Sequence, residues 1–70
     1  MPLAMAEAGK AYTIQRIKGK DETLRFLENL GFVAGAMISV VSESNGNLIV
    51  NIKESRVAIG LAMARKIFVS

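Results

Sequence analysis

The residues that most often carry chemistry in proteins are histidine and cysteine, and this sequence of 70 residues contains neither. Imidazole bases, thiol nucleophiles and the soft ligands of transition metals are therefore missing. The six Asp and Glu residues are scattered along the chain, whereas a hard-cation site needs several convergent oxygens. We therefore predict no catalytic residue, no resident metal and no cofactor, and a protein that acts by binding.

The densest group of charges is cationic and consists of Arg16, Lys18 and Lys20, with Asp21 and Glu22 directly after it. Such a group is most simply a solvated strand edge and turn, and otherwise a surface for an anionic partner. The net charge of +3 is a mild excess, and dedicated nucleic-acid binders usually gather their charge in one patch. The charge alone is weak support for a nucleic-acid partner.

The elements that must position these residues can be predicted from hydrophobic spacing. Residues 11 to 18, AYTIQRIK, are typical of a strand, because β-branched and aromatic residues sit among polar ones. Residues 21 to 30 follow a helical period, and Asp21 is the expected N-cap. The apolar stripe expected on this helix consists of Leu24, Phe26, Leu27 and Leu30.

Two glycines four residues apart mark the end of that helix and the next turn. Gly31 falls where a helix closes with a left-handed residue, a conformation that is nearly free for glycine. Phe32 would then pack back onto Leu27, as in a Schellman motif. Gly35 marks a turn before a strand at 36–42. Because the glycines lead out of a helix into a strand, they do not form a phosphate-binding loop.

The second half of the sequence reads as short strands joined by tight turns. Asn45-Gly46 between two β-rich runs predicts a type I′ hairpin, whose central residues both take positive φ. Five short strands with two small helices are too little for a sandwich and favour a mainly β fold, a closed or nearly closed small barrel. The remaining expected elements are strands at 47–53, 56–59 and 67–69, a turn at 53–56 and a helix at 61–66.

Length and hydropathy limit the organisation and location of the chain. A chain of this length is one domain near the lower size limit for independent folding, so we expect a single domain over residues 1–70. Its apolar runs are far shorter than the ~20 residues of a membrane-spanning helix. The N-terminus lacks a basic leader followed by a long apolar stretch. We therefore expect a cytoplasmic protein.

Three segments together resemble the ferrous iron transport protein A (FeoA) family. LENLGFVAGAMISVV, residues 27–41, looks like the family's signature, in which a leucine helix ends at a glycine and a second glycine opens the next strand. VAIGLAMARKIFV, residues 57–69, is similar to its closing segment, and GKAYTIQRIKG, residues 9–19, resembles its opening strand. The resemblance implies an SH3-like β-barrel of about five strands, with one helix between strands 1 and 2 and a short helix before the last strand.

The resemblance also implies a function. The family is associated with bacterial ferrous iron uptake, as a noncatalytic cytosolic partner of a membrane transporter that carries a GTPase domain. The expected partner surface is the helix at 21–30, its capping turn and the basic cluster, with self-association possible and no nucleic acid expected. The residues expected to bind the partner are Arg16, Lys18, Lys20, Arg25, Glu28, Leu61 and Arg65.

Two positions depart from the family pattern. Ala34 stands where the family commonly has proline, so the turn at Gly35 should be looser without being lost. Leu61 stands where polar residues are usual, and we expect it to be exposed. A single exposed leucine needs no explanation, and the sharper hypothesis is that Leu61 and Arg65 belong to a contact surface for a partner. Two other functions stay open: a nucleic-acid-binding small barrel, and a domain that binds or senses transition metal ions, which the missing His and Cys weaken.

Overall fold

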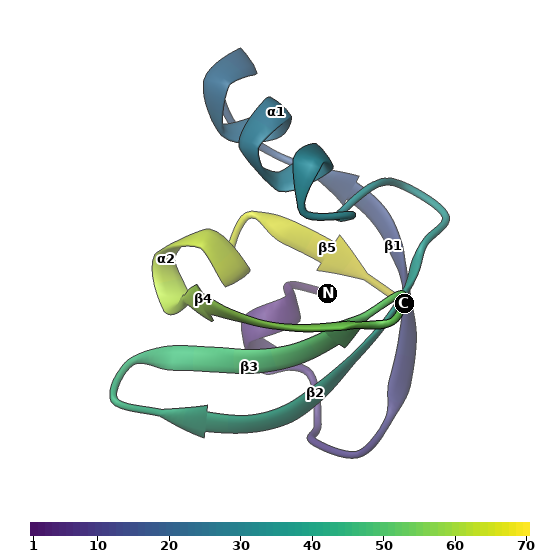
Figure 1. Cartoon of the computed structure of the whole chain (residues 1–70), viewed down its shortest axis with the longest axis vertical. Coiled ribbons are helices and arrows are strands. Elements are labelled where there is room, and N and C mark those ends of the chain that lie inside the picture. The colour runs from purple at the N-terminus through teal and green to yellow at the C-terminus, as the bar shows by residue number, and fades with distance from the viewer.

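Five antiparallel strands form one strongly curved sheet in the computed structural model, which describes all residues from 1 to 70 (Figure 1). The strand order is β4-β3-β2-β1-β5, and no pairing between β4 and β5 closes the sheet. The strands are β1 (Ala11–Ile17), β2 (Met37–Ser44), β3 (Asn47–Ile52), β4 (Ser55–Gly60) and β5 (Ile67–Val69). Three short helices accompany them: η1 (Leu3–Met5, a 3-10 helix), α1 (Asp21–Asn29) and α2 (Leu61–Ala64). The predicted mainly β class is confirmed.

The β2-β3-β4 meander is joined by two-residue turns. Asn45 and Gly46 have φ angles of 51° and 78°, and they join the paired residues Ser44 and Asn47. Two successive positive φ angles in a two-residue hairpin loop identify the predicted type I′ turn. The second turn, between Ile52 and Ser55, places Lys53 at φ 54°.

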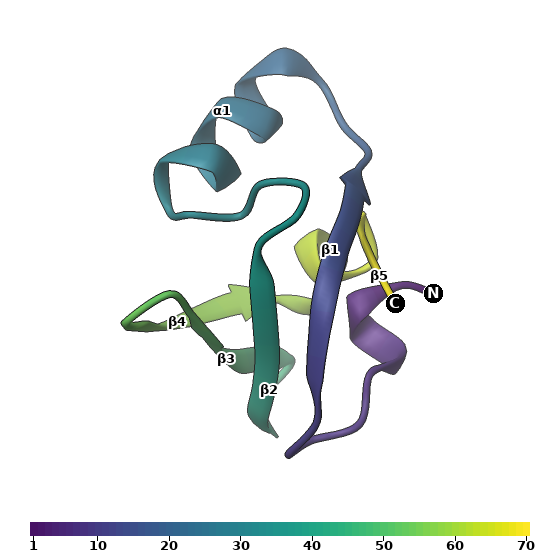
Figure 2. The same cartoon turned by 90° about the vertical axis from the view of Figure 1, so that its right-hand side faces the viewer.

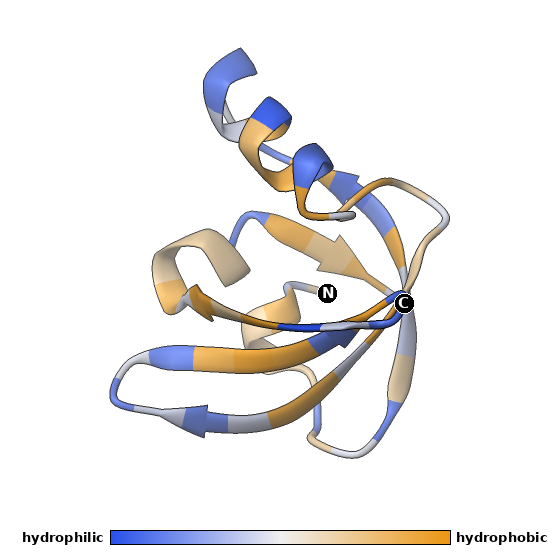
Figure 3. Cartoon of the chain, viewed as in Figure 1, coloured by the Kyte–Doolittle hydropathy of each residue, from blue (hydrophilic) through white to orange (hydrophobic).

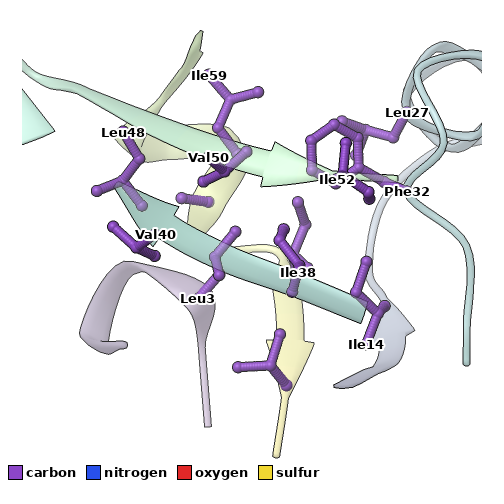
Figure 4. Close-up of a cluster of buried hydrophobic side chains, with 13 residues drawn as sticks. Leu3, Ile14, Leu27, Phe32, Ile38, Val40, Leu48, Val50, Ile52 and Ile59 are labelled. Carbon is purple, nitrogen blue, oxygen red and sulfur yellow. The ribbon is translucent and has the colours of Figure 1, made fainter. Parts of the chain in front are cut away.

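The core lies inside the curve of the sheet and contains only apolar side chains. Figure 4 shows how the strands, η1 and the end of α1 all contribute to it. Leu3 of η1 is fully buried, although the sequence pattern did not predict this helix. The 13 buried hydrophobic residues of the core are Leu3, Ile14, Leu27, Phe32, Ile38, Val40, Leu48, Val50, Ile52, Ile59, Ala64, Ile67 and Val69.

Helix α1 ends as predicted but begins differently. Gly31 has φ 102°, and the amides of Gly31 and Phe32 donate to the carbonyl oxygens of Glu28 and Leu27, both at 2.9 Å. These two bonds define the Schellman motif, and they bring Phe32 and Leu27 together in the core (Figure 4). The N-cap is Lys20, so the assignment of Asp21 was wrong. Asp21 already has helical geometry, and its carboxylate can favour the helix only through the dipole of the first turn.

The two ends of the chain lie side by side (Figure 2). The amide of Val69 donates to the carbonyl oxygen of Met1 at 2.7 Å, and the amino group of Met1 donates to the carbonyl oxygen of Val69 at 2.8 Å. A further bridge joins Pro2 to Phe68. The N-terminal residues therefore cover the outer edge of β5. No helix of the protein has the length and apolar character needed to span a membrane.

Candidate interaction surface

Helix α1 stands at one end of the molecule, and its first turns project away from the barrel (Figures 1 and 2). Leu27 is its only buried residue, while Leu24 and Leu30 are half-buried. Phe26 is 53% exposed, so its expected place in the apolar stripe was wrong. Successive helical residues differ by about 100° around the axis, so the residue beside a fully buried Leu27 points sideways. Phe26 is therefore a large apolar side chain left on the surface.

An open apolar groove runs between α1 and the turn that follows it. Its volume is about 400 Å³. Glu28 is the only charged residue in its lining, and Val33 is 38% exposed at its side. The residues that line it are Ile17, Leu24, Glu28, Phe32, Val33 and Ala34. Arg25 and Glu28 are both exposed on α1, and Glu28 alone of the two lines the groove.

The wall formed by Val33 and Ala34 is held by a hydrogen-bonded turn. The amide of Ala36 donates to the carbonyl oxygen of Val33 at 3.0 Å, and Gly35 between them has φ 90°. This combination is a type II turn, with Ala34 at the position where proline is common. The Gly35 amide donates to the carbonyl oxygen of Ile14 at 2.8 Å, which ties the turn to β1. The predicted turn is thus present with alanine in place of proline.

Two cations of the basic cluster lie over an aromatic ring of β5. The guanidinium carbon of Arg16 lies 4.9 Å from the centre of the Phe68 ring, and the Lys18 Nζ lies 5.8 Å from it. Both distances are within the range of a cation–π contact. The amide of Lys18 donates to the carbonyl oxygen of Lys66 at 2.8 Å, so the turn directly before β5 holds a further cation beside Lys18. Lys20 is exposed at the start of α1.

A β-bulge explains why Arg16 reaches this ring. Ile14 pairs with Val69 and Arg16 pairs with Phe68, so β1 holds one extra residue between the two pairs. Ile14 is buried and Ile17 packs against the core, whereas Arg16 is exposed. In a regular strand, Arg16 would share the inward face with Ile14, because side chains alternate with period two. The bulge turns Arg16 outward, as bulges beside functional sites often do.

The remaining predicted site residues lie on α2. Arg65 is exposed at the C-terminal end of this helix. Leu61 is half-buried and packs against the core, so the expectation that it is exposed was wrong. α2 covers the barrel, so a leucine at its first position lies in contact with apolar residues, whereas a polar residue there would turn toward solvent. No group of three or more Asp, Glu, His or Cys side chains in the protein could hold a metal ion.

Sequence reasoning did not assign Phe68, Lys66 or Val33 to a site. A signal for the first two was available, because Ile14 and Ile17 are three residues apart in a strand whose apolar residues should be two apart. That interruption is typical of a bulge. The role of Val33 depends on the path of the turn, which residue spacing alone does not describe.

A small β-barrel with one projecting amphipathic helix is the class that the sheet and this surface define. The sequence matches the FeoA domain model over residues 1–70, and the chain belongs to the FeoA family. It is 32% identical to a protein from Methanocaldococcus jannaschii named as an Fe(2+) transport protein A, over 97% of this chain and 83% of that protein.

Solved structures agree with this assignment. The fold is similar to a crystal structure of an iron uptake regulatory protein (FeoA), with a TM-score of 0.91 and 26% identity, over 99% of this chain and 93% of that one. It is also similar to Stenotrophomonas maltophilia FeoA complexed with zinc, with a TM-score of 0.86 and 22% identity, over 100% of this chain and 89% of that one. That protein is described as an SH3 domain protein, and the expected SH3-like architecture is confirmed.

Proposed function

We propose that this protein assists or regulates ferrous iron transport by binding a cytosolic domain of a GTPase-linked membrane iron transporter, without catalysing a reaction itself. Membership of the FeoA family and the relative named as an Fe(2+) transport protein A support the link to ferrous iron. The S. maltophilia protein has been proposed as a ferrous iron transport activating factor. The protein would act in the cytoplasm and reach the membrane only through its partner.

The observation that carries the proposal is the open apolar groove beside α1, together with the exposed Phe26 on the same helix. Aromatic side chains are enriched at protein interfaces, where a few of them supply most of the binding energy. The groove with Val33 at its side offers a concave apolar surface, and Phe26 offers a protruding one. Charges around the apolar centre would orient the partner more than they hold it. The charged residues proposed for this role are Arg16, Lys18, Lys20, Arg25, Glu28 and Arg65.

Docking would regulate transport by a shift of populations. A partner that binds one conformation of the transporter domain more tightly than another favours that conformation by the difference in binding free energy. The protein needs no chemistry of its own for this effect. Leu61 contributes less to the surface, because it packs against the core. A Leu61→Glu variant would therefore change folding as well as binding.

The test is a titration of the isotope-labelled protein with the soluble cytosolic domain of the transporter, followed by NMR. We expect shifts of the amide signals of α1 and the groove, and a Phe26→Gln variant should bind about tenfold more weakly, as for a central aromatic contact. Met5→Gln is the matched control, because Met5 is 72% exposed and apolar but lies on η1. Equal affinities of the two variants would remove Phe26 from the interface, and absent shifts at Leu24 and Val33 would remove the groove.

A nucleic-acid-binding function has one observation in its favour, the basic cluster around Phe68. Binding of single strands usually combines such charge with several aromatic rings on which bases stack. Here Phe32 is buried and Tyr12 packs against the core, so the exposed Phe26 on α1 is the only other aromatic ring open to solvent. The same NMR titration with a mixed oligonucleotide separates the two functions. Binding that falls steeply with salt would support the nucleic-acid function.

A further inference from the structure

The bulged part of β1 builds a second surface, separate from the groove. We name it the Phe68 surface and define it as Arg16, Lys18, Lys66 and Phe68. Phe68 lies between the buried residues Ile67 and Val69, so its half-buried ring is on the outer face of the sheet. The bulge brings Arg16 of β1, and Lys18 directly after β1, to this ring. The Phe68 surface is therefore a product of the fold rather than a run of charges along the chain.

The cations of the Phe68 surface form no ion pair in the protein. The single ion pair of the molecule joins the Lys10 Nζ to the Glu7 Oε2 at 3.1 Å, away from this surface. Arg16, Lys18 and Lys66 are all exposed. Two like charges that share one ring repel each other. An anion placed between them would attract both cations and offset this repulsion.

We propose that the Phe68 surface binds carboxylates of an acidic segment of a protein partner. The Arg16 guanidinium has the planar fork of donors that matches a carboxylate, and Lys18 supplies a second point charge on the same ring. The contacts with Phe68 hold both cations near one position, so part of the cost of ordering their side chains is met before binding. Lys66 adds positive charge from the turn directly before β5.

Because the Phe68 surface has only one aromatic ring, it favours an acidic peptide over a nucleic acid as the ligand. Carboxylates need only the cations, whereas bases need stacking partners that this surface does not provide beyond Phe68. The inference deepens the proposed function and rests on it for the source of the segment, which would belong to the transporter domain. The binding chemistry itself is independent of that source.

The experiment uses a capped hexaglutamate peptide as the probe and follows the amide signals of the labelled protein. We expect shifts at Arg16, Lys18 and Phe68. The double variant Arg16→Gln/Lys18→Gln should bind the peptide at least about fivefold more weakly than the unchanged protein does. The matched control is Lys53→Gln/Arg56→Gln, which removes the same number of charges from exposed positions at the β3–β4 turn. Its affinity should fall by no more than about twofold, because distant charges are screened by salt.

Equal weakening in the two double variants would overturn the inference, because net charge alone would then explain binding. A mixed oligonucleotide that shifts the Phe68 signals at a lower concentration than hexaglutamate would also overturn it. Retained dispersion of the amide signals checks that each variant is folded. Binding of hexaglutamate without binding of the transporter domain would reject the docking proposal and keep this inference. The opposite result is that hexaglutamate does not bind, while the transporter domain binds the unchanged protein and the Arg16→Gln/Lys18→Gln variant equally. This result would reject the inference and keep the docking proposal.

Discussion

Leu27 and Phe26 are neighbours on α1, but their side chains have opposite environments. Leu27 is fully buried and meets Phe32 across the Schellman turn, whereas Phe26 is 53% exposed. Figure 3 shows orange and blue segments alternating along α1, with its projecting first turn blue. The inner side of the helix is thus fixed by the core, and its outer side is available to a partner. Stability and recognition should therefore respond to different substitutions within a few residues of each other.

The largest effect should come from the inner side. Phe32→Ala removes a ring that is fully buried in the core, and it leaves a cavity that the short strands cannot fill. We expect the free energy of unfolding to fall by about 3–5 kcal/mol, the range for such truncations. Urea unfolding followed by circular dichroism measures this change. A loss under about 1 kcal/mol would mean that the end of α1 is not part of the core.

A smaller loss should follow from changing the backbone at the same turn. Gly31→Ala should cost about 1–2 kcal/mol, because the left-handed conformation at φ 102° strains any residue with a Cβ atom. An added Cβ atom would meet Lys53 Cδ at 3.6 Å, an ordinary contact, so the cost comes from the backbone rather than from a clash.

Gly60→Ala is the control for that substitution. Gly60 has φ −67° at the N-cap of α2, and its Cβ atom would lie 3.8 Å from Asn47 Oδ1. This variant should change the unfolding free energy by less than Gly31→Ala does. If both variants lose the same stability, the left-handed turn is not what stabilises the end of the helix.

The turn that forms the wall of the groove should become more stable when position 34 holds proline, the residue that the family commonly has there. Ala34→Pro should raise the free energy of unfolding by about 0.4–1 kcal/mol, because proline fits the second position of a type II turn and restricts the unfolded chain. The Ala34 amide makes no backbone hydrogen bond that proline would remove. Thermal unfolding of the two proteins gives the comparison, and a lower midpoint for the variant would show that the turn geometry differs.

The smallest effect on stability should come from the outer side. Phe26→Gln should change the free energy of unfolding by no more than about 0.5 kcal/mol, since glutamine is a good helix former and the ring is half in solvent already. The same urea experiment tests it. A loss that approaches that of Phe32→Ala would place Phe26 in the core and end the distinction between the two sides.

The sequence predicted the elements whose formation depends on neighbouring residues. The cap at Gly31 and Phe32 and the hairpin at Asn45-Gly46 follow from backbone conformations that few residue types adopt. The alternation in β3 also follows from local pattern, because Leu48, Val50 and Ile52 occupy one face of it.

Features that depend on tertiary packing were missed or wrong. Leu3 is buried because η1 covers the barrel beside β5 and α2, and nothing in the short N-terminal segment indicates this. Phe26 was assigned to an apolar stripe that is narrower in the structure, because α1 touches the barrel along one line only. Asp21 lies one residue inside the helix that it was expected to cap. For the candidate surface, the sequence indicated Arg16 and Lys18 but not the bulge that directs them to Phe68.

The pairing of β5 has a consequence for the order of folding. Among the strands, β5 pairs only with β1, and Ile14 must find Val69, 55 positions further along the chain. Closing so long a loop costs more chain entropy than forming the β2-β3-β4 meander, whose two-residue turns bring neighbours together. We expect the meander to form early, and the sheet to be complete only after β5 has been synthesised. Until then the edge of β1 that later pairs with β5 has no partner, and this interval is when a nascent chain would be most prone to pair wrongly.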